Sequence, residues 1–200
     1  MLKKILFFIT IISVFSCNNQ SETEEKIDRI EVDLKVIRFE QEFASTKPQQ
    51  LPELKQKYPF LFPEQFPDSV WIDKLSDTLQ LEINQAVEDE FSNFTNQKDE
   101  LYALFQHMKY YFPEFEVPVV ITVTSEVDYK NKIIYTGDYL FVSLDTYLGT
   151  DHQFYTGLQE YLKKNFKKKS DSSRCCGRDF KKIRSRSRFP NVFKSYGVLR

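Results

Sequence analysis

Few residues in this chain of 200 amino acids have the side-chain chemistry of a catalytic or metal site. The only histidines are His107 and His152. His107 has no second ligand four residues along a helix, the spacing of a helical zinc pair, so a structural or surface role is expected. His152 follows Asp151, but no nucleophile lies nearby in the sequence, and Asp151 is accounted for as a helix cap.

Four carboxylates surround the most strand-like part of the sequence: Glu126, Asp128, Asp138 and Asp145. Carboxylate oxygens suit hard cations, but this spacing fits no EF-hand loop, and turn formation accounts for these residues. The sequence also lacks HExxH, GxSxG and a glycine-rich phosphate loop. We therefore predict no catalytic residue, no metal site and no bound cofactor.

The one modification that the sequence predicts is lipid attachment at Cys17. Lys3 and Lys4 precede an apolar run over residues 5–15, which is typical of a cleaved secretory signal. This run is too short for a membrane span, which needs about 20 residues. The ending Val14-Phe15-Ser16-Cys17 resembles a bacterial lipobox, which implies cleavage before Cys17 and acylation of that residue.

These features divide the N-terminal part into a lipoprotein signal peptide, residues 1–16, and a polar, flexible tether, residues 17–29. Several acyl chains on Cys17 would hold the protein stably on a membrane of the cell envelope, with its domain outside the cytoplasm. The alternative is an ordinary secreted protein whose cysteine is incidental.

The charge is unevenly distributed. Residues 170–200 carry nine Lys and Arg against two Asp, a net charge of +7, whereas the rest of the chain has a net charge of -8. Residues 184–188 alternate arginine and serine, a composition that favours nucleic-acid binding. An exported, lipid-anchored protein rarely meets nucleic acid, so we predict no such partner. Cys175 and Cys176 are adjacent, which makes a poor disulfide, and a structural zinc site needs four ligands.

The segment 118–145 predicts a small antiparallel sheet, a meander of three strands. Alternating or continuous apolar runs mark the strands at residues 119–123, 133–135 and 139–142. Gly137 can adopt the positive φ of the tight turn between the second and third strands. A further short strand is predicted at 32–36 from its alternating pattern.

Apolar residues recur every three or four positions in the segments on either side of this sheet. They predict helices at residues 52–57, 68–91, 96–112 and 151–166. We therefore expect an α+β fold in which amphipathic helices pack on one face of the small antiparallel sheet.

Several unusual strings resemble the GldB family of gliding-motility lipoproteins from Bacteroidota. They are KYPFLFP at 57–63, PDSVWI at 67–72, KYYFPEF at 109–115, the stretch 121–149, and DHQFY at 151–155, together with the lipobox. The resemblance covers residues 1 to about 169 and implies a GldB-like domain at 30–169. It also implies a non-catalytic envelope component that is required for gliding and associates with other proteins of the gliding machinery, with no cofactor.

Family members run well beyond the length of this chain, and the resemblance ends after Lys169. We hypothesise that the basic tail, residues 170–200, is an aberrant and disordered product of a shifted reading frame that leaves the domain incomplete. Residues 167–169 are three lysines, which AAA codons would write as a slippage-prone homopolymer. Sequencing the gene across these codons would test the hypothesis.

Two other functions remain open. A degenerate zincin-related hydrolase is compatible with helices beside an antiparallel sheet, although its HExxH motif is absent. A ligand-binding envelope lipoprotein would require a deep apolar pocket with a few polar groups.

Overall fold

The structure, a computed structural model, describes residues 22–163. Cys17, Cys175, Cys176 and the basic tail therefore lie outside the described residues. The α-helices are α2 (Glu22–Asp28), α3 (Phe39–Ser45), α4 (Leu51–Lys57), α5 (Asp68–Ser76), α6 (Thr78–Phe91), α7 (Thr95–Tyr111) and α8 (Glu160–Lys163). The strands are β1 (Val36–Arg38), β2 (Val119–Val123), β3 (Ile133–Tyr135) and β4 (Tyr139–Ser143). Short 3₁₀ turns are η1 (Pro48–Gln50), η2 (Pro59–Leu61), η3 (Leu144–Thr146) and η4 (Gln153–Tyr155).

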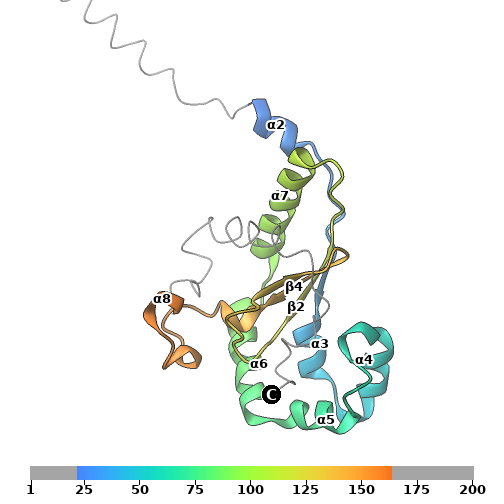
Figure 1. The fold of residues 1–200 in the computed structure, drawn as a ribbon, viewed down its shortest axis with the longest axis vertical. Helices are drawn as coiled ribbons and strands as arrows, with labels where there is room; N and C mark the ends of the chain where they lie inside the picture. Colours follow the sequence, from blue (N-terminus) through green and yellow to red (C-terminus); the bar gives the residue numbers. More distant parts are fainter. Residues whose placement is uncertain (1–21, 164–200) are drawn as a thin grey trace, which may run out of the picture.

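The fold is α+β, as predicted, but its sheet is mixed. The strand order is β1-β2-β4-β3, so β4 lies between β2 and β3. Figure 1 shows β2 and β4 side by side. β1 and β4 both run parallel to β2, whereas β3 runs antiparallel to β4. The prediction of an antiparallel meander was therefore wrong. Only its second half is confirmed, the β3–β4 hairpin, with Gly137 at a φ of 96° in the turn.

Burial explains why β4 takes the central position. β4 buries Leu140, Phe141 and Ser143, whereas all three residues of β3 are only half-buried. A central strand is covered on both faces and beside both edges, so the more apolar strand gains more from lying there. The order of strands in space consequently differs from their order in the sequence.

Helices cover both faces of the sheet, which corrects the expectation that they pack on one. Val120 and Leu140 belong to a core formed with α6 and α7. The neighbouring residues Ile121 and Phe141 point the other way, into a second core with α3, α4 and α5. Successive residues of a strand face opposite sides, so two cores require helices on both sides.

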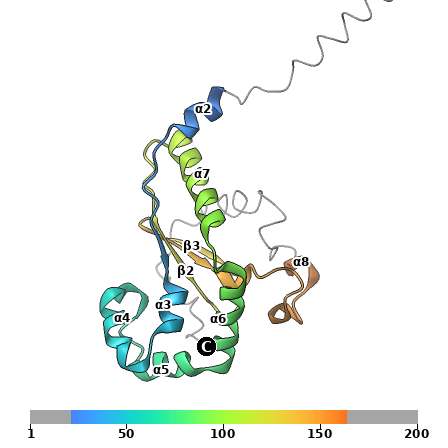
Figure 2. The same cartoon turned by 180° about the vertical axis from the view of Figure 1, so that it is seen from behind.

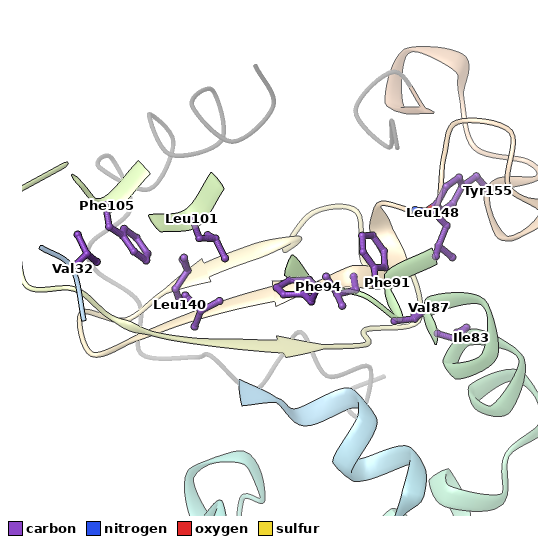
Figure 3. Packing of buried hydrophobic residues seen from close by; sticks show 12 residues of the cluster. Val32, Ile83, Val87, Phe91, Phe94, Leu101, Phe105, Leu140, Leu148 and Tyr155 are labelled. Atoms are coloured by element: carbon purple, nitrogen blue, oxygen red, sulfur yellow. The ribbon is translucent and has the colours of Figure 1, made fainter. Parts of the chain in front are cut away.

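Figure 3 shows the first of these cores. Leu101 and Phe105 of α7 lie over Leu140 of β4, and Val87 and Phe91 of α6 continue the layer along the sheet. The second core is rich in aromatic rings, several of which meet edge to face. Its members include Phe39, Phe43, Tyr58, Phe62 and Trp71, and the aromatic residues at 58–66 are thus mostly packed.

Ordered structure begins earlier than the sequence predicts. Helix α2 lies within the expected tether, residues 17–29, and packs beside the end of α7 (Figures 1 and 2). Ile27 is fully buried there, and the Gln106 amide donates to the carbonyls of Asp28 and Ile30. The strand expected at 32–36 is displaced to β1, because Val36 is the first residue to pair with β2.

The predicted helices at 52–57 and 96–112 are confirmed as α4 and α7, and that at 68–91 is divided into α5 and α6. The side chain of Asp77 accepts the Gln80 backbone amide at 2.8 Å and caps the start of α6. The helix predicted at 151–166 was wrong in its described part, which contains only η4 and α8. Gly157, at a φ of 87°, interrupts the chain between them.

Candidate functional site

The three parallel strands β1, β2 and β4 end at one edge of the sheet, where buried polar side chains gather. In open parallel sheets this edge is where ligands usually bind, so it is the first place to search for a site. We call this group the polar edge; it consists of Glu40, Gln80, Thr122, Thr124, Ser125, Ser143, Asp145 and Thr146, all of them buried.

Asp145 lies at the centre of the polar edge. It follows β4 in η3 and is completely buried. Its carboxylate accepts the backbone amides of Ser125, at 3.1 Å from both oxygens, and of Val127, at 2.6 Å. The Ser125 hydroxyl lies farther away, 3.4 Å from the nearer oxygen. Asp145 thus fixes the segment that leaves β2.

Burial raises the pKa of Asp145 to about 6, against a usual value of 3.8, and the amide hydrogen bonds offset only part of this effect. The Tyr155 hydroxyl donates to the Asp145 carbonyl at 2.7 Å and accepts the Leu148 amide at 3.0 Å. Burial also raises the pKa of Tyr155. Both side chains are consequently tied into the fold by hydrogen bonds to the backbone.

A second cluster joins the ends of β1 and β2. The Arg38 guanidinium pairs with the buried Glu40 carboxylate, which also accepts the Thr122 hydroxyl. Arg38 donates further to the Phe91 carbonyl at 2.9 Å and lies over the Phe94 ring, 4.6 Å from its centroid. This network connects the sheet edge to the end of α6.

Gln80 connects the start of α6 to β2. Its amide nitrogen donates to Thr124, at 2.9 Å, and to Asn84, at 2.7 Å. Its side-chain oxygen is buried and has no hydrogen-bond partner.

Each histidine contacts residues close to it in the fold. The Nδ1 atom of His107 is 2.8 Å from the Ala103 carbonyl, and its Nε2 atom is 3.5 Å from Glu24. His152 caps η4 by accepting the Phe154 amide, so the cap is His152, whereas the sequence had indicated Asp151. Neither contact supplies Ser125 with a general base, the group that activates a serine nucleophile.

The four carboxylates considered from the sequence do not converge. Glu126 pairs with Lys74 at 3.0 Å, and Asp128 accepts the Asn131 amide at 2.9 Å. Asp138 is exposed in the hairpin turn, and Asp145 is buried. Within residues 22–163, no group of three or more His, Cys, Asp or Glu side chains is placed to hold a metal ion.

One hollow in the described part of the chain has a volume of about 520 Å³ and lies beside α6. Its lining consists of Glu82, Gln85, Ala86, Asp89, Glu90, Leu148, His152 and Gln153. These are mostly polar or acidic residues, whereas a ligand-binding lipoprotein would need a deep apolar pocket. A second hollow of about 270 Å³ beside α4 is also lined mainly by polar residues.

Sequence reasoning considered Asp145 only as a turn residue or cation ligand, and it missed Glu40 and Gln80 entirely. Glu40 lies between Phe39 and Phe43 in a stretch whose helical pattern was weak, so nothing indicated its burial. The paired Arg38, two residues earlier at the strand end, is the one signal that could have identified it.

Among the described residues, no helix has the length and apolar character that crossing a membrane requires. The chain matches the family model described as gliding motility protein GldB over residues 20–178. No curated protein and no solved structure matches it. The match covers well over half of the chain and includes both helical layers and the whole sheet, so the chain belongs to the GldB family of gliding motility proteins.

Proposed function

We propose that this protein is a lipid-anchored, non-catalytic part of the gliding machinery, with a structural or assembly role outside the cytoplasm. Membership of the GldB family supports a role in gliding. The lipobox at Cys17 supports attachment to a membrane of the cell envelope. Other proteins of the machinery are the expected partners.

The observation that carries the non-catalytic role is the arrangement at the polar edge. Where a parallel sheet would normally offer groups to a ligand, the Asp145 carboxylate is buried and accepts the amides of Ser125 and Val127. Glu40 is likewise engaged by Arg38 and Thr122. Such side chains hold strands and loops together, which suits a rigid scaffold.

The anchor is tested by metabolic labelling with radioactive palmitate in a strain that lacks the native gene. The wild-type chain should incorporate the label and remain with the membranes, whereas Cys17→Ser should do neither. Cys175→Ser is the matched control, and it should label like the wild type. Full labelling of Cys17→Ser would contradict the anchor.

The non-catalytic role is tested by a chain without histidine, His107→Ala with His152→Asn. Asparagine retains the ability to cap η4. This variant should support gliding to the same extent as the wild-type chain in the same strain. Loss of gliding at an unchanged level of folded protein would contradict a role that requires no acid–base chemistry.

A further inference from the structure

One end of the described fold carries exposed aromatic side chains. Tyr110 and Tyr111 close helix α7, and Phe112 follows it. Tyr111 is 59% exposed and Phe112 is 43% exposed, and the rings of Tyr110 and Tyr111 meet edge to face at 5.0 Å. We call these three residues the aromatic tip.

The aromatic tip lies at the end of the fold from which the chain leads back to Cys17. Helix α2 is beside the C-terminal end of α7 in both views, far from α5 (Figures 1 and 2). The buried Ile27 and the Gln106 amide, which donates to the carbonyls of Asp28 and Ile30, hold α2 against the last turns of α7. Only four residues, 18–21, separate Cys17 from Glu22, and the five steps between these two Cα atoms span at most about 18 Å.

A cysteine acylated at this position would therefore hold the aromatic tip close to the lipid surface. Tyrosine and phenylalanine rings are favoured at the boundary between lipid headgroups and acyl chains, where an apolar ring is buried and a hydroxyl stays hydrated. A second contact beside the acyl anchor would limit rotation of the domain about its short connection.

The charges around the aromatic tip indicate which type of lipid surface it would contact. Glu22, Glu25, Glu114 and Glu116 are acidic, and Lys26 already pairs with Glu22 at 2.9 Å. Two further basic residues are present, Arg29, which pairs with Glu25 at 4.0 Å, and Lys109 in the last turn of α7. The acidic residues still outnumber the basic ones, so this surface would not attract anionic lipids. Contact would depend on the aromatic rings, and it would be strongest on a zwitterionic surface.

We propose that the aromatic tip, Tyr110–Phe112, inserts into the headgroup boundary of the membrane that holds the acylated Cys17. The proposal rests on the proposed lipid anchor. It gives the domain a fixed orientation, with α2 and the end of α7 toward the lipid and the α5–α6 end away from it.

The test uses the full, acylated chain in phosphatidylcholine vesicles whose acyl chains carry bromine close to the headgroups. A tryptophan is introduced by Tyr111→Trp, and the matched control is Leu81→Trp in the first turn of α6. Leu81 is 50% exposed, similar to Tyr111, and lies toward the α5–α6 end. The native Trp71 is 3% exposed and contributes the same background to both variants.

Bromine should remove most of the added emission of Tyr111→Trp and leave that of Leu81→Trp unchanged, relative to vesicles without bromine. Equal emission of Tyr111→Trp in both kinds of vesicle would overturn the proposal. A blue-shifted but unquenched emission would also overturn it, because it would show that protein covers the tip. Mass spectrometry of the same sample separates the two proposals: without acyl chains on Cys17 both fail, whereas with them a lack of quenching refutes the tip alone.

Discussion

The Asp145 carboxylate holds the backbone of Val127 in a left-handed conformation. One oxygen accepts the Val127 amide at 2.6 Å, and Val127 has a φ of 59° directly after Glu126 at 52°. A β-branched residue avoids this region, so the conformation costs energy that the hydrogen bonds to the buried carboxylate help to offset. The end of β2 therefore depends on a group that follows β4.

The pKa of Asp145 predicts a pH dependence of stability. Its pKa in the folded state, about 6, lies above the usual 3.8. The stability that protonated Asp145 gives the fold is therefore fully present below about pH 4 and is lost as pH rises through 6. Asp145→Asn cannot ionise. The free energy of unfolding of the wild type minus that of Asp145→Asn should therefore fall by about 3 kcal/mol between pH 4 and pH 7, as measured by urea denaturation.

Asp138→Asn is the control, because it removes an exposed carboxylate near the sheet. Its free energy of unfolding, compared with that of the wild type, should not change in this way with pH. The contradicting result is a difference in free energy of unfolding, wild type minus Asp145→Asn, that grows with pH. It would mean that the amide hydrogen bonds outweigh the cost of burying the charge. The pKa of Asp145 would then lie below its usual value.

Removing one member of the Arg38–Glu40 pair should strongly destabilise the domain. Arg38→Met leaves the buried Glu40 carboxylate without its cation and should cost about 3–5 kcal/mol in chemical denaturation. The double variant Arg38→Met, Glu40→Met should cost less than the sum of the single variants, because no buried charge remains. Lys26→Met breaks the exposed pair with Glu22 and should cost less than about 1 kcal/mol. If the losses of stability at Arg38 and Glu40 were additive, the two side chains would not be energetically coupled, contrary to this prediction.

Ile27 should make α2 a stable part of the domain. Ile27→Ala removes a completely buried side chain and should lower the free energy of unfolding by about 2–4 kcal/mol. Leu79→Ala, at a side chain that is 46% exposed, should change it by no more than about 0.5 kcal/mol. Equal, small effects of the two variants would support a flexible segment at 17–29 after all.

The hairpin between β3 and β4 should require glycine at position 137. An added Cβ at Gly137 meets no atom within 4 Å, so a substitution is opposed by the φ of 96° alone. Gly137→Ala should therefore cost about 1–2 kcal/mol without a change in the packed core. Thermal unfolding would measure the loss, and an unchanged melting temperature would show that this turn relaxes freely.

The sequence was sufficient for elements with strong local patterns. Residues 119–123 alternate like a strand, 133–135 are an apolar run before a turn, and 96–112 have the period of a helix. The structure confirms all three elements. Strand order could not be predicted in this way, because it depends on how much surface each strand buries against distant helices. The burial of Val120 and Ile121 on opposite faces of β2 could not be predicted for the same reason, because it requires helical layers from other parts of the chain on both faces.

Single buried residues were also beyond prediction. Ile27 is one apolar residue in a polar, acidic stretch, so no periodicity marks it. Asp145 and Glu40 are of a residue type that is normally exposed, and only the hydrogen bonds made in the fold justify their burial. The candidate site therefore emerged from the structure, whereas the family and Cys17 emerged from the sequence.

The pairing of β1 with β2 sets the order in which this domain can be completed. Val36 pairs with Val120, so the first strand to leave the ribosome finds its neighbour in the sheet only after α3 to α7 have been synthesised. Bringing together such distant segments slows folding, because the intervening chain loses entropy before the contact is gained. Until then β1 lacks its neighbouring strand, and an unpaired strand edge is the kind of surface through which folding chains aggregate.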